Sequence, residues 1–88
     1  METQEARLKR LRMRSWRRGT KEMDLVLGPW ADAHLAGLGE AALVLYDEVL
    51  EEYDQELVLW VMGTVAAPER FAAMIGEISA FARIRLAK

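Results

Sequence analysis

The sequence lacks cysteine altogether and contains one histidine, His34, in 88 residues. The absence of cysteine excludes disulfides, cysteine-ligated zinc sites and thiol catalysis. One histidine cannot supply a histidine-rich metal site, and a catalytic triad would have to borrow residues from another chain. We therefore predict neither a catalytic site nor a metal site within this chain.

Long hydrophobic runs are also missing. The longest uncharged run covers residues 57–68, which is far shorter than the ~20 residues that a membrane helix requires. Arginine and lysine interrupt the N-terminal segment throughout, unlike a signal peptide, and Glu2 and Glu5 count against a mitochondrial transit peptide. We expect a bacterial cytoplasmic protein without membrane insertion.

Basic residues are absent from Glu22 to Glu69, a stretch with 11 acidic residues. Eight of the 12 lysines and arginines lie in the first 21 positions. A hydrophobic share of 52% excludes a disordered chain, and a charged share of 30% indicates a soluble one. A basic segment therefore precedes an acidic remainder, and the two could neutralise each other or serve a partner.

Helical periodicity dominates the sequence, and strand patterns are weak. We predict an all-α fold, a small single-domain bundle of about five short helices that spans residues 1–88. In this interpretation residues 1–18 hold a basic N-terminal helix and residues 19–85 hold the remaining helices.

Two helices are predicted in the N-terminal half, over residues 4–16 and 20–33. Pro29 lies inside the second, where its ring would clash with a carbonyl one turn earlier. We therefore expect a kink or an early end at this position. Gly37 and Gly39 then predict a turn.

Three further helices are predicted in the C-terminal half. The first begins at Glu40 and has an apolar face that extends to Tyr53. Asp54 is the predicted N-cap of a short helix that Gly63 ends. Pro68 suits the first turn of the last helix.

Aromatic residues at helical spacing are assigned to the core rather than to a ligand cage. This interpretation holds for Trp30 and Trp60. Trp16 adjoins the basic motif and is a candidate for a contact surface. His34 is expected to be a solvated residue near a helix end.

The most informative segment is Arg17-Arg18-Gly19-Thr20-Lys21-Glu22-Met23-Asp24. If residues 18–23 are helical, Gly19 and Arg18 both lie one turn from Glu22. The result would be a bare backbone patch, flanked by opposite charges, that another surface could approach closely. Alternatively, Gly19 caps the first helix and Arg18 forms an ordinary surface pair with Glu22. The residues alone slightly favour this second interpretation.

The sequence resembles the succinate dehydrogenase assembly factor family, which has bacterial and mitochondrial members. Three elements carry the resemblance: Trp16-Arg17-Arg18-Gly19-x-x-Glu22-x-Asp24, then Leu27 with Pro29-Trp30, then Asp54-x-Glu56-Leu57-x-x-Trp60. It implies a non-enzymatic, chaperone-like assembly factor that binds the flavoprotein subunit of succinate dehydrogenase, and in bacteria of fumarate reductase. Members of the family promote covalent attachment of FAD to a histidine of that subunit.

The resemblance also implies where the partner binds. The family's functional positions correspond to Arg18, Gly19 and Glu22, with Arg17 and Asp24 as neighbours, and Trp16 adjoins them. No cofactor is expected to be bound tightly by the chain itself, because FAD becomes attached to the partner. We expect a monomer when the protein is free.

The basic segment allows other interpretations. Clustered arginines could bind nucleic acid or an acidic membrane surface, and an antitoxin-like regulator is a further possibility. The net charge of −2 and the lack of interleaved aromatics argue against nucleic acid. An enzyme that used Glu22 as a general base would lack a second polar group at suitable spacing. A simpler hypothesis is that the basic helix packs across the acidic third helix.

Overall fold

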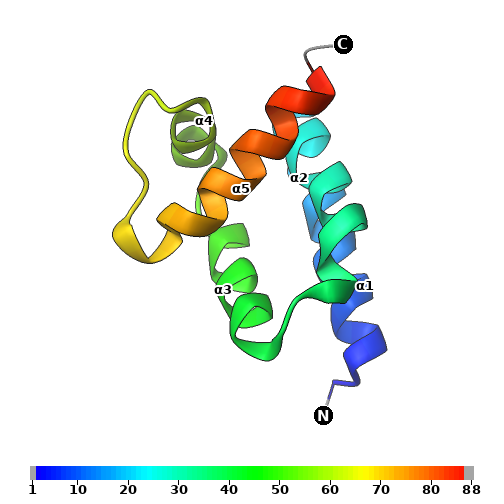
Figure 1. The fold of residues 1–88 in the computed structure, drawn as a ribbon. Helices are drawn as coiled ribbons and strands as arrows, with labels where there is room; N and C mark the ends of the chain where they lie inside the picture. Colours follow the sequence, from blue (N-terminus) through cyan, green and yellow to red (C-terminus); the bar gives the residue numbers. More distant parts are fainter. Residues whose placement is uncertain (1, 87–88) are drawn as a thin grey trace.

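The computed structural model describes residues 2–86 and contains helices without any strand in that range (Figure 1). The all-α prediction is confirmed. Within this range, no helix is both long enough and apolar enough to span a membrane. The elements in chain order are α1 (Gln4–Trp16), α2 (Lys21–His34), a 3-10 helix (Leu35–Gly37), α3 (Glu40–Leu50), α4 (Asp54–Met62) and α5 (Glu69–Leu86).

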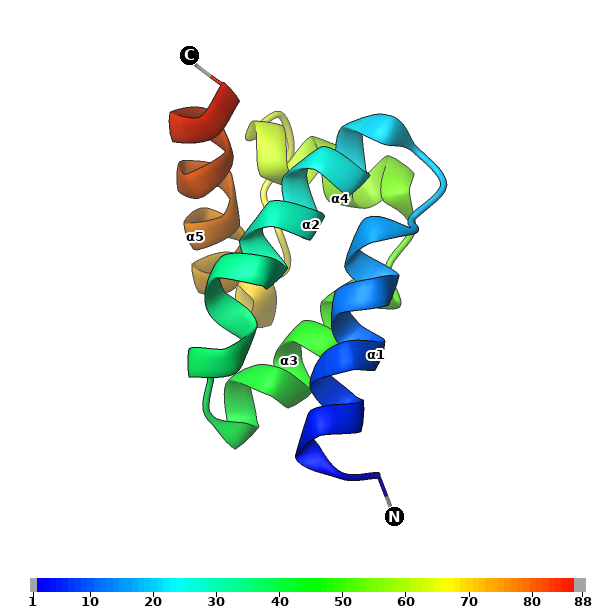
Figure 2. The same cartoon turned by 90° about the vertical axis from the view of Figure 1, so that its right-hand side faces the viewer.

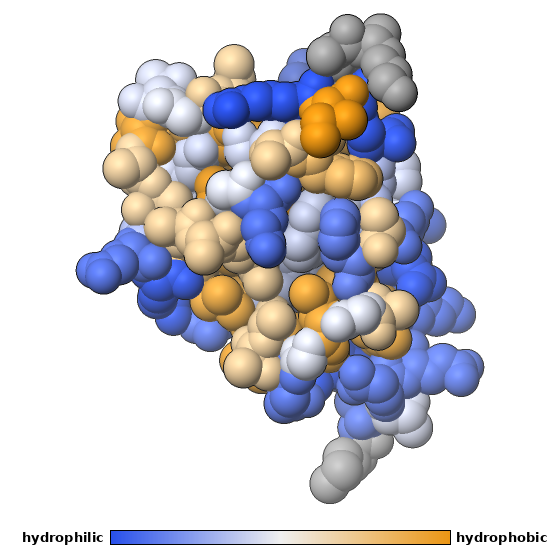
Figure 3. All heavy atoms as spheres, in the orientation of Figure 1, coloured by the Kyte–Doolittle hydropathy of each residue, from blue (hydrophilic) through white to orange (hydrophobic). Residues whose placement is uncertain are grey.

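The helices surround one core, and α1 and α2 form a hairpin along one side of it (Figure 2). Helix α5 packs against α2 and α4, and α3 contacts both α1 and α5. The start of α1 and the end of α5 lie at opposite ends of the molecule (Figure 1). Hydrophilic residues crowd the side of α1 and α2, whereas apolar residues are more frequent over α4 and α5 (Figure 3).

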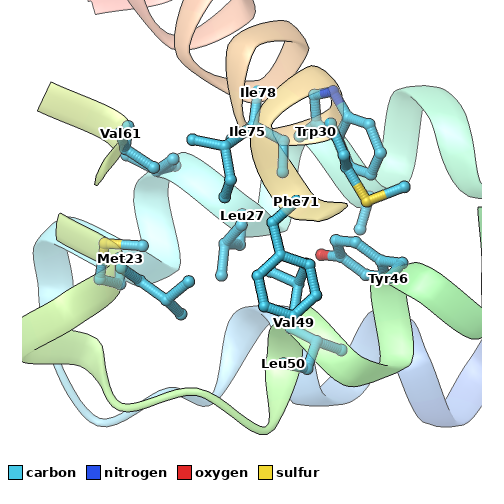
Figure 4. Close-up of a cluster of buried hydrophobic side chains, with 14 of the residues drawn as sticks. Met23, Leu27, Trp30, Tyr46, Val49, Leu50, Val61, Phe71, Ile75 and Ile78 are labelled. Carbon is cyan, nitrogen blue, oxygen red and sulfur yellow. The ribbon is translucent and has the colours of Figure 1, made fainter. Parts of the chain in front are cut away.

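Apolar side chains from each of α1 to α5 meet in the core. Figure 4 labels some of those that come from α2, α3, α4 and α5. Trp30 of α2 is 1% exposed and lies beside Tyr46 of α3, with ring centroids 5.1 Å apart. The buried Tyr46 hydroxyl is satisfied by the Ser15 hydroxyl at 2.5 Å, and Ser15 itself donates to the Leu11 carbonyl. Burial raises the pKa of Tyr46 to about 12. The predicted core positions Trp30 and Trp60 are confirmed.

Of the two outcomes expected at Pro29, a kink or an early end, the early end is wrong, because α2 continues to His34. A proline inside a helix removes one backbone hydrogen bond and costs about 3 kcal/mol. Pro29, Trp30 and Ala31 are all buried at this point. Burial of this segment against the core offsets the cost of the proline.

The region around Tyr53 also differs from the prediction. Helix α3 ends at Leu50, and Tyr53 lies in the connection to α4 with 76% of its surface exposed. Tyr53, rather than Asp54, is the N-cap of α4. Asp54 does not cap the helix because its carboxylate binds side chains of the α1–α2 connection. Gly63 ends α4 with a φ of 78°, as predicted.

His34 was expected to be solvated, and this expectation is wrong. Its ring stacks on Trp30 at 5.0 Å and meets the edge of Phe81 at 5.1 Å. The Nδ1 atom lies 3.0 Å from the Trp30 carbonyl oxygen. The ring is half-buried because α5 covers the end of α2.

The basic face of α1 lies against the acidic face of α3. Arg7 pairs with Glu40 at 2.7 Å, and Arg14 pairs with Asp47 at 2.6 Å. Arg10 reaches the same Asp47 carboxylate at 3.2 Å. These positions recur at helical spacing, so one face of α1 meets one face of α3. The simpler hypothesis for the charge pattern is therefore confirmed.

One close contact had no counterpart in the sequence analysis. The indole of Trp16 lies on Gly28 of α2, where an added Cβ would come within 2.3 Å of the Trp16 Cδ2 atom. Glycine at this position lets α1 and α2 approach each other.

We predict that Gly28→Ala destabilises the protein by about 1–3 kcal/mol, because the methyl group displaces the Trp16 ring. The change is measured as a lower melting temperature and a red shift of tryptophan fluorescence. Gly76→Ala in α5 is the matched control, since a Cβ there meets no atom within 4 Å. The control should stabilise the helix by up to about 1 kcal/mol. Equal stabilisation in both variants would contradict the packing assignment.

We also predict that the contact between α1 and α3 is sensitive to acid. Partial burial alone would raise the pKa of Asp47, but hydrogen bonds from Arg14 and Arg10 outweigh burial and lower it. The ionised carboxylate therefore stabilises the fold above its ordinary pKa, and this contribution is lost as the pH falls toward the folded-state pKa.

Thermal melts at about pH 7 and about pH 3 measure this loss. Asp47→Asn should melt lower than wild type at neutral pH and show a smaller further decrease in acid. Glu77→Gln, an exposed change in α5, should keep the wild-type pH dependence. Identical pH dependence in Asp47→Asn and wild type would refute the prediction.

Candidate functional site

The segment singled out by the sequence connects α1 to α2, at the end of the molecule where α4 begins (Figure 2). Residues 17–20 are not helical, and Gly19 has a φ of 99°. This backbone conformation strongly favours glycine. The condition of a helix across residues 18–23 is therefore not met, and α2 begins at Lys21, one residue after its predicted start. The alternative with Gly19 as the cap of the first helix does not hold either, because the C-cap of α1 is Arg17.

Arg18 points into the molecule, with 10% of its side chain exposed. Its Nε donates to the Asp54 carboxylate at 2.9 Å, and its Nη2 donates to the Glu52 carbonyl at 2.6 Å. Its Nη1 donates to the Leu50 carbonyl. Arg18 therefore ties the α1–α2 connection to the α3–α4 connection and forms no surface pair with Glu22.

Two further residues complete this network. The Asp24 carboxylate accepts a hydrogen bond of 2.7 Å from the backbone N–H of Arg18. The Thr20 hydroxyl donates to the second oxygen of Asp54 at 3.0 Å. Asp24 of α2 thus binds the backbone of the connection that precedes its helix. Asp54 accepts hydrogen bonds from two residues of the motif, Arg18 and Thr20. Sequence reasoning missed this role of Asp54, although the residue belongs to the acidic-x-Glu-Leu-x-x-Trp pattern.

The outward side of the motif is formed by Arg17, Gly19, Lys21 and Glu22, all of which are exposed. A Cβ added to Gly19 would have no atom of the chain within 4 Å. The bare backbone patch that the sequence suggested therefore exists, but on a loop and not on a helix. Its charged neighbours form no salt bridge with any residue between 2 and 86.

A groove of about 780 Å³ lies along this patch. Arg17, Gly19 and Glu22 line it from the α1–α2 connection, and Tyr53 and Val58 line it from the α3–α4 side. Across residues 2–86, no cluster of histidine and carboxylate side chains could hold a metal ion. The groove thus offers backbone, opposite charges and one aromatic ring, which suit the recognition of another protein surface.

Trp16 is not among the residues that line this groove. It is 39% exposed and packs on Gly28, and its Nε1–H donates to both Asp32 carboxylate oxygens at 3.3 Å. The structure therefore brings Arg17, Gly19 and Glu22 together but places Trp16 on the neighbouring surface of the hairpin.

We predict that Arg18→Ala lowers the free energy of unfolding by about 2 kcal/mol, because it removes the ion pair with Asp54 and leaves two carbonyls unpaired. For a domain of this size the melting temperature should fall by about 10 °C. Arg17→Ala is the matched control: its side chain is exposed, and its effect should stay within about 0.5 kcal/mol. Similar melting temperatures for the two variants would show that the Arg18 network does not hold the loop.

Comparison with known proteins gives a consistent family assignment. Residues 9–82 match the Sdh5 family, described as the flavinator of succinate dehydrogenase. The chain is 33% identical over 84 residues to succinate dehydrogenase assembly factor 2, mitochondrial, of Schizosaccharomyces pombe, which covers 93% of this chain and 60% of that protein. It is 39% identical over 59 residues to the protein of the same name from Meyerozyma guilliermondii, covering 67% of this chain and 44% of that protein.

A bacterial relative matches along more of its own length. The FAD assembly factor SdhE of Acetobacter pasteurianus is 33% identical over 81 residues, which cover 91% of this chain and 74% of that protein. The chain thus spans about half the length of the two mitochondrial relatives, 60% and 44%. The chain belongs to the Sdh5 family, the flavinators of succinate dehydrogenase.

Proposed function

We propose that this protein is an assembly factor that binds the flavoprotein subunit of succinate dehydrogenase and promotes its covalent flavinylation with FAD. Membership of the Sdh5 family and the names of the relatives support this function. One structural observation carries it: Gly19 presents an open backbone patch beside the exposed Glu22 in a groove.

The residues of this chain contribute binding and orientation. The absence of a side chain at Gly19 lets the partner approach the backbone closely. Arg17 and Lys21 offer charged donors beside it, and the Glu22 carboxylate offers an acceptor, so contact is possible in one orientation. In this proposal the bond-forming chemistry belongs to the flavin and to the partner, and the assembly factor is not an enzyme.

Arg18 has a different part in this proposal from its neighbours. Three of its nitrogens already donate within the chain, so Arg18 holds the loops that form the docking surface and does not itself contact the partner. Arg17 is the arginine of the motif that is exposed to a partner. We further propose a one-to-one complex in the bacterial cytoplasm, with the fumarate reductase flavoprotein subunit as a second partner.

The nucleic-acid alternative is less consistent with the charge distribution. Arg7, Arg10 and Arg14 are paired with carboxylates of α3. Phosphate binding relies on cations that are available to neutralise the backbone. Much of the basic face of α1 is instead neutralised inside the fold.

We predict that Gly19→Arg abolishes flavinylation, because the added side chain fills the approach to the backbone patch. Cells that lack the protein are complemented with each variant, and covalent flavin fluorescence of the flavoprotein subunit is read in a denaturing gel. Gly19→Ala is the matched control, since it shares the backbone strain at a φ of 99° but adds only a methyl group. It should retain more of the signal than Gly19→Arg.

Glu22→Gln should reduce the flavinylation signal without changing the melting temperature, because Glu22 is exposed. It keeps the size of the side chain and removes its charge. A full signal from Gly19→Arg would refute docking at Gly19, and an unchanged signal in cells without the protein would refute the proposed function.

A further inference from the structure

An exposed aromatic residue from the α3–α4 connection lines the same groove as the motif. Tyr53 lines the groove together with Gly19 and Glu22, although 30 or more residues separate it from them in the sequence. With 76% of its surface exposed, it is the most exposed large hydrophobic side chain between residues 2 and 85. Single exposed hydrophobic residues are common, so exposure alone assigns no role.

What distinguishes Tyr53 is how firmly its backbone is held. The Leu50 and Glu52 carbonyls, just before Tyr53, both accept hydrogen bonds from Arg18. The next residue, Asp54, binds Arg18 through its carboxylate. The Tyr53 carbonyl itself accepts from the backbone N–H groups of residues 56 and 57, at 3.0 Å each.

The Tyr53 ring is thus carried by a fixed backbone while the ring itself remains free to make contacts. A tyrosine has few rotatable bonds, so a held tyrosine offers a large contact area at low entropic cost. Preorganisation of this kind raises affinity because less conformational entropy is lost on binding. Tyrosine is also enriched among the residues that dominate binding energy at protein interfaces.

The same arginine links this tyrosine to the glycine. Arg18 precedes Gly19 in the chain, and its guanidinium fixes the connection that carries Tyr53. The distance across the groove between the Gly19 backbone and the Tyr53 ring therefore depends on Arg18. The affinity of a partner that contacts both Gly19 and Tyr53 would depend on this distance.

We propose that Tyr53 is a second contact residue for the flavoprotein subunit, and that Arg18 is a positioning residue that acts through it. The inference rests on the proposed function and assigns the chemistry of the partner surface. That surface has an apolar pocket for the tyrosine ring, a carboxylate for Arg17 or Lys21, and a hydrogen-bond donor for Glu22.

The test measures the dissociation constant between the full chain and the purified flavoprotein subunit of succinate dehydrogenase by isothermal titration calorimetry. Tyr53→Ala should weaken binding by at least about tenfold with an unchanged melting temperature. Tyr53→Phe keeps the ring and should bind within about threefold of wild type. Val44→Ala is the matched control, because Val44 is an exposed apolar residue that does not line the groove, and its binding should be unchanged.

The role of Arg18 is tested by a double-mutant cycle with Arg18→Lys, at a temperature where every variant is folded. Arg18→Lys keeps the charge but loses the planar fork that reaches several acceptors. It should weaken binding in the wild-type background and add little to the loss in Tyr53→Ala. Strictly additive losses would overturn the positioning role, because independent sites add.

The outcomes separate this inference from the proposed function. If wild type and Val44→Ala bind the subunit and Tyr53→Ala binds equally well, Tyr53 is not a contact residue and the proposed function is unaffected. If wild type does not bind the subunit, the proposed function and this inference both fail.

Discussion

The arrangement of the proposed docking surface depends on one guanidinium, that of Arg18, whose side chain is 10% exposed. Arg18 donates from three nitrogens to Asp54 and to the carbonyls of Leu50 and Glu52, and its own backbone N–H is held by Asp24. A planar, permanently charged group with several donors is suited to joining two loops in this way. Removal of one partner from such a network leaves the others unpaired, which makes the network cooperative.

The charge pattern of the chain is explained by two uses of its basic segment. One face of α1 pairs with carboxylates of α3 and closes the bundle, as in the contacts of Arg14 with Asp47 and Glu51. The residues after this face, in the α1–α2 connection, leave Arg17 and Lys21 exposed. The basic segment thus has two parts. Its arginines in α1 form ion pairs that stabilise the fold, and Arg17 and Lys21 at the α1–α2 connection remain exposed to solvent.

Much of the fold was accessible from the sequence because helical periodicity is a local signal. The five helices, the core positions of Trp30 and Trp60, and the end of α4 at Gly63 follow from patterns within a few residues. The continuation of α2 through Pro29 did not follow, since burial against distant helices decided it.

The candidate site was predicted less completely, for a related reason. Its exposed residues, Gly19 and Glu22, were recognisable from the motif, but its geometry was not. The inward direction of Arg18 and the exposure of Tyr53 depend on contacts between segments that are more than 30 residues apart. Neither periodicity nor spacing within one segment carries such information, and the positive φ of Gly19 shows why the helical interpretation of residues 18–23 failed.

The central claim is that a surface fixed by Arg18 meets the partner at Gly19. The most direct measurement is a structure of this chain bound to the flavoprotein subunit of succinate dehydrogenase. The account predicts partner atoms within about 4 Å of the Gly19 backbone, with the Arg18 guanidinium still bound to Asp54 and the two carbonyls. A complex in which Arg18 has turned outward to bind the partner, or in which the partner occupies another face, would contradict it.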